Sequence, residues 1–439
     1  MALGDVSGGT RAAPRGSAYP RRSPGWGRRL RLVLTVLGPG LIAAFADNDA
    51  GGITTLSVVG ASYGYSMLWA LLLITFSLAI TQEMSARIGA VTGKGLAALI
   101  RERYRVRITF FAMLALLLAN FGTTVAEFAG VGAALELFGL PRVISVPIAA
   151  AAVWLLVIRG NYRSVERALL IMSVIYVSYV LSAFLARPDW GEVARSTVTP
   201  TLQLDGGFLV TLIALIGTTI TPWGQFFIQS YVVDKGVSRR DYAVTRKEVY
   251  VGALITNGIS LFIIVSTAAT LYPQGIQIED AAQAALALKP LAGPLATQLF
   301  ALGLLNASLL GAAVVPLSTA YAVCEAFGWE GGVSRSWEDA PIFNILYTLA
   351  IAGSAAVVLL PGLPLVQVIL LSQTINGVLL PFILIFAVRL ASDRDLMGEM
   401  ANGKLRNAVV WVTAVAIIAM SLALLAVTVV LPSMGVDVG

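Results

Sequence analysis

The stretch Ala46-Asp47-Asn48-Asp49-Ala50-Gly51-Gly52 interrupts the first long apolar segment of the chain, between residues 32–45 and 53–59. A charged side chain at the centre of a bilayer costs about 2.5–3.5 kcal/mol on insertion scales, so such residues usually face a bundle interior and serve a function. The tandem glycines give the backbone freedom to leave the helical conformation. We therefore expect a helix that breaks inside the membrane and offers its carbonyls and half-helix ends to an ion. The simpler alternative is a kinked helix with a solvated outer cap.

The composition is that of a polytopic membrane protein. Of the 439 residues 57% are hydrophobic and 12% are charged, against about 25% charged in a soluble domain. The single cysteine, Cys324, excludes an internal disulfide framework. The absence of histidine removes the commonest proton shuttle and the commonest transition-metal ligand. The net charge of +6 comes mostly from arginines in loops, which indicates membrane topology rather than nucleic-acid binding.

Apolar runs predict eleven membrane spans, each near the length of about 20 residues that a bilayer requires. They lie at 32–60 (interrupted), 66–90, 107–138, 142–158, 163–186, 207–233, 248–272, 293–325, 338–360, 364–390 and 407–431. Lys and Arg concentrate after the second, fourth, sixth and tenth spans, and the loops at 61–65, 139–141, 273–292 and 361–363 have almost none. This distribution predicts a cytoplasmic amino terminus and an external carboxyl terminus.

The first 29 residues are rich in Gly, Pro, Ser and Arg and have little apolar surface. We expect them to form a disordered cytoplasmic tail before one transmembrane domain over residues 30–439. A cleaved signal peptide is the alternative, but the following apolar run is long, starts late and lacks a small-residue cleavage site. Short helices are expected near 92–105 on the cytoplasmic face and near 276–289 outside.

A second interrupted segment lies in the sixth span, in the sequence Gly217-Thr218-Thr219-Ile220-Thr221-Pro222-Trp223-Gly224-Gln225. A proline within a span removes a backbone hydrogen bond, and the neighbouring Gly and Thr residues let the freed groups turn toward a cavity. Paired interruptions at corresponding positions of two halves are typical of the midplane site of a transporter. The sequence therefore predicts a substrate site between the two breaks.

The polar groups of the two breaks are hard oxygen donors. Asp49, Thr218, Thr221 and Gln225 offer carboxylate, hydroxyl, amide and carbonyl oxygens, which suit Mg²⁺, Ca²⁺ or Mn²⁺. Further intramembrane polar groups, each equally able to form an ordinary interhelical hydrogen bond, could join them: Gln373 with Asn376 in the tenth span, and Glu127 in the third.

Several motifs, in order along the chain, resemble those of a known family. They are Gly38-Pro39-Gly40, Ser85-Ala86-Arg87-Ile88-Gly89-Ala90-Val91-Thr92-Gly93-Lys94, Ala126-Glu127-Phe128 and Ser372-Gln373. Over nearly its whole length the chain resembles the Nramp family of divalent-metal transporters. The resemblance implies an all-α fold of eleven transmembrane helices. Two inverted five-helix repeats, about 30–190 and 205–392 with broken first and sixth helices, are followed by an extra helix at 407–431.

The chain departs from the family pattern at the chemistry. Asp49-Ala50-Gly51-Gly52 falls on the family's Asp-Pro-Gly-Asn motif, so the Asp remains and the metal-binding Asn becomes Gly52. Thr221-Pro222-Trp223 falls on Met-Pro-His, so the thioether is lost, and the family's backbone-carbonyl ligand falls on Thr218. This pattern is similar to the divergent Nramp-related magnesium transporters. The candidate metal residues are Asp49, Gly52, Thr218, Thr221, Gln225 and Gln373.

A roomy site of oxygen donors favours Mg²⁺ carried partly hydrated by alternating access, with Mn²⁺ also accepted. Proton coupling is not expected, because the family's third-span acid and sixth-span His fall on Thr124 and Trp223. Glu127, a titratable group retained from the family, keeps coupling open. The role of Asp47, as a second attractor of cations or an entry-side polar group, also stays open.

Three other functions were weighed. A proton-coupled transporter of Mn²⁺ or other transition metals and a sodium-coupled symporter of organic solutes share the architecture. An integral-membrane hydrolase using Asp47 and Asp49 lacks a complete set of metal ligands, and the chain is expected not to be an enzyme. The expected partners are the divalent ion and the bilayer, with no cofactor and no nucleic acid. We expect a monomer in a prokaryotic inner (plasma) membrane.

Overall fold

The computed structural model describes residues 48–159, 173–240, 242–333 and 335–430. All of them belong to one compact unit. The predicted tail at 1–29, Asp47 and the part of the first span that precedes Asn48 lie outside these residues. Within the described ranges the secondary structure is helical and contains no strand, in agreement with the expected all-α class.

The helices follow the predicted apolar runs closely. The longer ones are α3 (Ala50–Tyr63), α4 (Leu68–Thr92), α6 (Val106–Glu136), α7 (Arg142–Ile158), α11 (Gly206–Thr219), α12 (Pro222–Asp234), α13 (Tyr242–Thr270), α16 (Ala296–Phe327), α17 (Pro341–Val358), α18 (Leu365–Ser392) and α20 (Lys404–Leu425). Shorter helices connect them: α5 (Leu96–Arg103), α9 (Val177–Leu185), α10 (Trp190–Val198), α14 (Ala281–Ala285), α15 (Lys289–Ala292) and α19 (Arg394–Met397).

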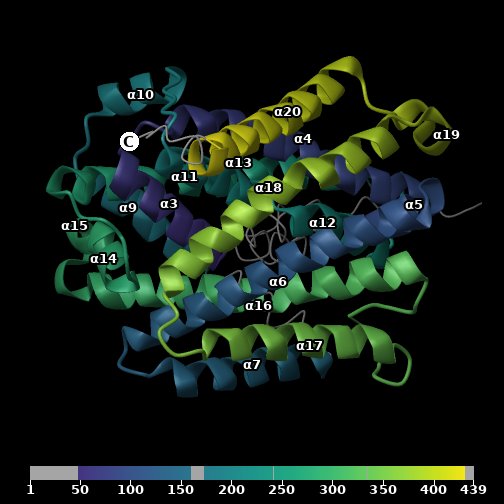
Figure 1. Ribbon diagram of the computed structural model, residues 1–439, viewed down its shortest axis with the longest axis horizontal. Helices are drawn as coiled ribbons and strands as arrows, with labels where there is room; N and C mark the ends of the chain where they lie inside the picture. Colours follow the sequence, from purple (N-terminus) through teal and green to yellow (C-terminus); the bar gives the residue numbers. More distant parts are fainter. Residues whose placement is uncertain (1–47, 160–172, 241, 334, 431–439) are drawn as a thin grey trace, which may run out of the picture. The chain divides into compact units, whose positions relative to one another are not determined.

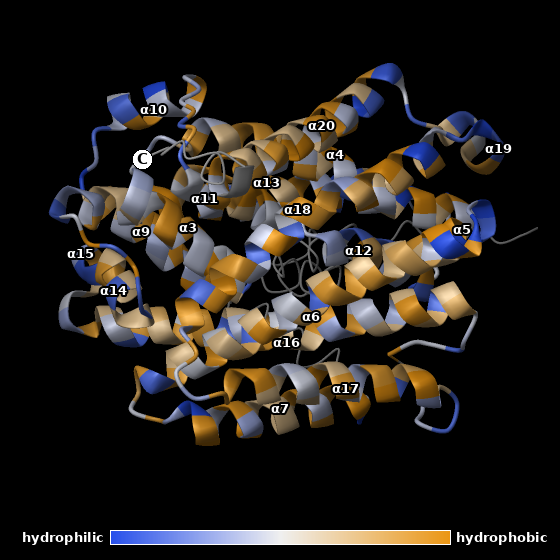
Figure 2. Ribbon diagram, in the orientation of Figure 1, coloured by the Kyte–Doolittle hydropathy of each residue, from blue (hydrophilic) through white to orange (hydrophobic). Residues whose placement is uncertain are grey.

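Eight helical segments in the described ranges are long and apolar enough to cross a membrane, and two shorter apolar helices accompany them. The molecule is therefore a multi-pass membrane protein, while the count of eleven spans remains a prediction. Figure 2 shows the same division by hydropathy: polar residues gather at α10 and α15 on one side and at α5 and α19 on the other. Exposed side chains such as Phe110, Phe111 and Leu118 on α6 belong to the apolar zone between them.

The short flanking helices lie where the sequence predicted them. Helix α5 falls within 92–105; it buries Leu99 and Ile100 and leaves Arg101 and Arg103 exposed. Helices α14 and α15 fall on the predicted external segment, and Asp280 caps the first of them. Both segments behave as amphipathic connections between spans.

The helices around the two predicted breaks pack closely together (Figure 1). Helix α3 packs against α13, α11 and α18, and α11 packs against α18 along much of its length. Gly217 permits this approach, because a Cβ atom there would overlap the backbone of Gln373 and Gly377. Helix α6 lies between α16 and α18. Two chain segments far apart in sequence are thereby held at one place inside the bundle.

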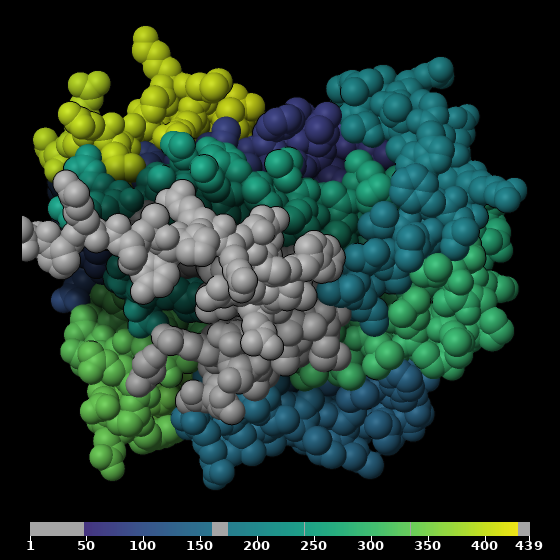
Figure 3. Space-filling view, turned by 180° about the vertical axis from the view of Figure 1, so that it is seen from behind, coloured from purple at the N-terminus to yellow at the C-terminus, as the bar shows by residue number. Residues whose placement is uncertain are grey.

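The carboxyl-terminal helix α20 packs on the outside of this group, against α18, α11 and α4. In the space-filling view its yellow residues lie along one edge, beside purple residues of the first described helices (Figure 3). Near the beginning of α20, Arg406 lies 3.5 Å from the buried Glu83 of α4. Glu83 also pairs with Arg87 at 3.1 Å and accepts a hydrogen bond from the Tyr242 hydroxyl. This ionic cluster fixes the ends of α4, α13 and α20 together.

Candidate cation site

Asp49 holds the beginning of α3. Its backbone is extended, and its Oδ1 accepts a hydrogen bond of 2.7 Å from the Gly52 N–H, which caps the helix. The side chain is buried, and Oδ2 has no hydrogen-bond partner among the described residues. A buried carboxylate oxygen without a partner is costly unless a ligand completes it. One oxygen therefore serves the helix end, while the other remains available to a cation.

Glu127 of α6 meets the same helix end. Its Oε2 accepts a hydrogen bond of 3.2 Å from the Ala50 N–H, and its carboxyl group neighbours that of Asp49. Glu127 is fully buried, and its Oε1 is also without a partner in the described part of the chain. Gly311 of α16 makes room for this carboxylate, since a Cβ atom there would overlap it. Two buried carboxylates side by side favour a divalent cation between or beside them.

The second break is present where the sequence predicted it. Helix α11 ends at Thr219 and α12 begins at Pro222, whose missing N–H costs nothing at the first helical position. Thr221 caps α12, because its Oγ1 accepts a hydrogen bond of 3.2 Å from the Gly224 N–H. The hydroxyl of Thr218 is buried, with no partner within the described ranges. The break therefore presents neutral oxygen groups, in contrast with the acidic end of α3.

Gln373 of α18 lies against both breaks. A Cβ atom on Gly51 would overlap the Gln373 side-chain amide, and one on Gly217 would overlap the Gln373 backbone. The Oε1 atom of Gln373 accepts a hydrogen bond of 3.0 Å from Asn376, which also donates to Thr123 at 2.8 Å. A carbonyl oxygen has a second lone pair, so this oriented amide retains capacity for a cation.

Not every predicted residue is directed in the same way. The Oε1 atom of Gln225 accepts a hydrogen bond of 2.9 Å from Ser85 of α4, so this side chain is engaged with α4. Gly52 contributes its N–H to Asp49. Asp49, Gly52 and Gln373 thus come together, with Glu127 joining them and Thr218 beside the contact of α11 with α18. In the described ranges no group of three or more His, Cys, Asp or Glu residues could hold a metal.

Sequence reasoning missed two contacts at the first break. The Tyr176 hydroxyl donates to the Asn48 carbonyl at 3.1 Å, and the Ser260 hydroxyl donates to the Asn48 Oδ1 at 3.4 Å. No motif connects these three positions, so only the packed helices reveal them. The two positions where the chain lacks the family's proton-handling groups are also buried: Thr124 donates to the Asn120 carbonyl at 2.7 Å, and Trp223 is fully enclosed.

A bundle of membrane-spanning helices in which a broken helix and a second helix end meet at buried carboxylates defines a membrane transporter. The family model described as "Natural resistance-associated macrophage protein-like" matches residues 40–427, and the chain belongs to this family, Nramp. The membership confirms the family named from the sequence motifs. It also agrees with the expectation that the chain is not an enzyme and that a metal is a substrate rather than a cofactor.

Curated relatives match the chain over most of its length. The "Divalent metal cation transporter MntH" of Deinococcus radiodurans is 30% identical over 423 residues, covering 93% of this chain and 92% of the relative. The protein of the same description from Ralstonia nicotianae is 31% identical over 415 residues, covering 90% of each.

Solved structures show the same fold. The Eremococcus coleocola manganese transporter, in complex with an aromatic bis-isothiourea substituted compound, matches with a TM-score of 0.71 at 19% identity, covering 95% of this chain and 91% of that one. MhsT in complex with L-phenylalanine matches with a TM-score of 0.53 at 15% identity, covering 89% and 98%. The fold is therefore shared by carriers of different substrates, and the substrate must be argued from the site.

Proposed function

We propose that this chain transports divalent metal ions, chiefly Mg²⁺ and also Mn²⁺, and that the ion crosses partly hydrated by alternating access without proton coupling. The observation that supports this most strongly is the free Oδ2 of Asp49 at the beginning of α3, beside the free Oε1 of Glu127. The candidate ligands remain Asp49, Gly52, Thr218, Thr221, Gln225 and Gln373.

The charge of the site supports a divalent cation. Two buried carboxylates repel the carboxylate of an amino acid, which disfavours an organic-anion substrate of the kind that other carriers with this fold take. Relatives at 30% and 31% identity are described as divalent metal cation transporters, which fits the same substrate class.

The choice of metal rests on the departures from the family motif. Gly52 and Thr221 stand at positions where the family has Asn and Met, so the site loses one amide ligand and its soft thioether. Mg²⁺ prefers six oxygen ligands and gives up its water reluctantly. Few protein ligands and smaller side chains suit an ion that keeps part of its water shell. Mn²⁺ accepts the same ligands, whereas softer metals lose the sulfur that favours them.

Uncoupled transport is inferred from Thr124 and Trp223, which stand where the family has an acid and a His. The membrane potential alone suffices as a driving force, because two charges crossing 100 mV gain about 4.6 kcal/mol, at about 2.3 kcal/mol each. The proximity of Glu127 to Asp49 favours the second candidate, a proton-coupled Mn²⁺ transporter, since a titratable group lies directly at the site.

The remaining topology belongs to the same proposal. Two inverted repeats, about 30–190 and 205–392, place the two breaks at corresponding positions, and the helix at 407–431 lies outside both. The amino terminus is cytoplasmic and the carboxyl terminus external, in a bacterial plasma membrane, and the transporter acts as a monomer. Cysteines introduced singly at 62 and 402 and labelled from either side of intact cells test the orientation: residue 62 should react from outside and residue 402 only after permeabilisation.

The transport proposal is tested in proteoliposomes with an imposed inside-negative potential. Mg²⁺ and Mn²⁺ entry is followed with ion indicators, and internal pH is followed in parallel. We expect both metals to enter without acidification of the lumen. Proton entry in step with metal would establish the proton-coupled alternative. Metal entry that fails while sodium drives uptake of an organic solute would establish the symporter.

A further inference from the structure

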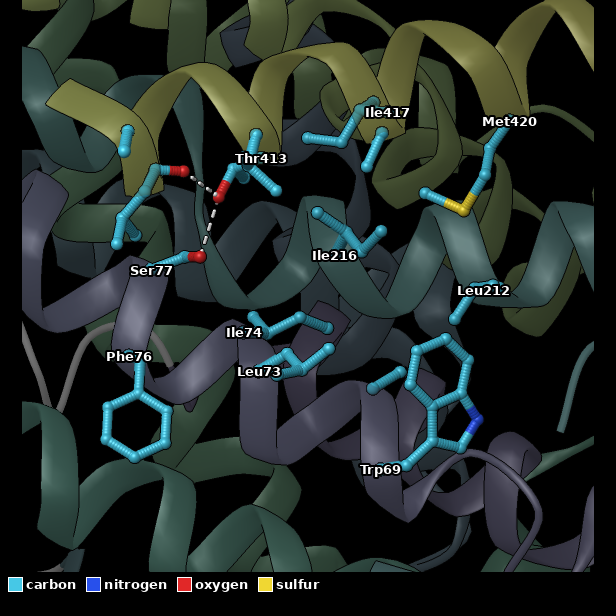
Figure 4. Close-up of a pocket in the computed structure, with 15 residues that line it drawn as sticks. Trp69, Leu73, Ile74, Phe76, Ser77, Leu212, Ile216, Thr413, Ile417 and Met420 are labelled. Atoms are coloured by element: carbon cyan, nitrogen blue, oxygen red, sulfur yellow. Dashed lines mark hydrogen bonds between the residues drawn. The ribbon is translucent and has the colours of Figure 1, made fainter. Parts of the chain in front are cut away.

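A second cavity lies away from the cation site, between α4, α11 and α20. This groove has a volume of about 380 Å³. Figure 4 shows its walls: Trp69, Leu73 and Phe76 from α4, Leu212 and Ile216 from α11, and Met420 from α20. Helix α20 forms the open side, and only 17% of its apolar window is buried by other helices. The groove therefore opens toward the hydrocarbon of the membrane.

The polar atoms in the groove are already satisfied. The hydroxyls of Ser77 and Thr413 are 2.7 Å apart, and Thr413 also donates to the Val409 carbonyl at 2.9 Å (Figure 4). The Trp69 indole N–H donates to the Thr201 carbonyl at 3.0 Å and leaves its ring for the groove. Water entering such a groove would find few partners, whereas an alkyl chain needs none. The walls therefore select an apolar occupant.

A cation stands at one end of the groove. Ala408, Val412, Ala416 and Met420 line it at intervals of four residues, which places them on one face of α20. Lys404 precedes them on the same face by one further turn, at the exposed first residue of the helix. Lys404 forms no ion pair with any other described residue, whereas the nearby Arg406 pairs with Glu83. An apolar groove that ends at an available ammonium group is complementary to an acidic amphiphile.

We propose that this groove binds an anionic phospholipid, with its phosphate at Lys404 and one acyl chain along the face from Ala408 to Met420. Basic residues at the membrane surface attract anionic lipids, and each buried CH₂ group adds to binding. Helix α11 forms one wall and ends at the second break, so the lipid contacts an element that reaches the cation site. This proposal does not depend on which ion is transported.

Native mass spectrometry of the purified full-length protein tests the proposal. The protein is titrated with phosphatidylglycerol or phosphatidylcholine of identical acyl chains. Wild type should bind one phosphatidylglycerol more tightly than phosphatidylcholine. Lys404→Gln should reduce this preference about fivefold, as expected for about 1 kcal/mol from one lysine at a charged surface, while Lys247→Gln, another exposed lysine, should not.

Filling the groove gives the second arm. Ala416→Phe should weaken both lipids at least about tenfold, while Val415→Phe, which adds a ring at the exposed neighbouring position of the same helix, should weaken neither. If Ala416→Phe fails to fold, Lys404→Gln against Lys247→Gln still decides the question. Equal effects of each variant and its control would overturn the proposal. So would a lipid-free dimer that Ala416→Phe dissociates, because the groove would then be an interface between copies.

Discussion

The two interruptions of the membrane helices use the same local device and present opposite chemistry. At the first, Asp49 caps α3 with a carboxylate; at the second, Thr221 caps α12 with a hydroxyl. In each case the cap accepts the N–H three residues ahead. The first cap leaves a charged oxygen free and has Glu127 beside it, whereas the second is neutral throughout.

This difference separates attraction from discrimination. Charge at the beginning of α3 determines how strongly any divalent cation is held, because Coulomb energy inside a protein is large. The α11–α12 break determines which cation is preferred, because its neutral ligands can be hard or soft without changing the net charge. Substitutions at the first break should therefore weaken all metals, and substitutions at the second should change their order.

The largest effect is expected from Asp49→Asn. It removes the charge but retains a side chain that can cap α3. We expect Mg²⁺ transport to show an apparent affinity lower by about 150-fold, or about 3 kcal/mol, as for other buried charges that lose a partner. The matched control is Asp205→Asn, since Asp205 caps α11 in the same manner, with a bond of 2.8 Å from the Phe208 N–H, far along the helix from the break. Equal losses in both variants would remove the distinction.

The next effect concerns the contact that joins the breaks. Gly51→Ala places a methyl group into the Gln373 amide. Overpacking of this kind costs about 1–3 kcal/mol, and we expect transport to fall about thirtyfold in the same uptake assay. Gln373→Ala should restore part of it in the double variant by clearing the space, although it removes a candidate ligand. A double variant as inactive as the sum of the two single changes would show that the residues do not touch during transport.

A smaller effect is expected from Glu127→Gln. The amide oxygen can still accept the bond from the Ala50 N–H, so the helix end should persist while one negative charge is lost. Apparent affinities for Mg²⁺ and Mn²⁺ should fall together by about tenfold, or about 1.4 kcal/mol, measured by metal uptake at fixed potential. A change confined to the pH dependence of uptake, with affinity intact, would instead favour the proton-coupled alternative.

The smallest change in activity is expected from Thr221→Met. A thioether at the second break should raise transport of Mn²⁺, and more so of softer Cd²⁺, relative to Mg²⁺ by about fivefold in competition uptake. Loss of the α12 cap should also lower stability by about 1 kcal/mol, seen as a lower melting temperature. Thr221→Ala loses the cap without adding sulfur and Thr221→Ser keeps the cap, so neither should change the order of metals. An unchanged order in Thr221→Met would place selectivity elsewhere.

The sequence predicted those parts of this arrangement that depend on local chemistry. Helix bounds agree within a few residues because hydropathy and length alone define a span, and the second break was found because Thr221 and Pro222 signal a helix start. Asp49 was found because a carboxylate in an apolar run has few explanations other than function. The family assignment followed from motifs that the family model confirms.

Contacts between distant segments were beyond that reach. The bond from Ala50 to Glu127 joins residues 77 positions apart, and the bond from Ser85 that engages Gln225 joins residues 140 apart. Such pairs depend on how helices pack, which a single sequence does not reveal. The ionic cluster at Glu83 and the groove under α20 were missed for the same reason: their residues read as ordinary span ends and lipid-facing positions until α20 is placed against α4.

The most direct test of the cation site is equilibrium Mg²⁺ binding to the detergent-solubilised protein, measured by isothermal titration calorimetry for wild type, Asp49→Asn and Asp205→Asn. We predict one Mg²⁺ bound by wild type and by Asp205→Asn with the same affinity, and no measurable binding by Asp49→Asn at the same concentrations. Mg²⁺ binding by Asp49→Asn that equals wild type would contradict the central claim that the free carboxylate oxygen at the beginning of α3 holds the transported ion.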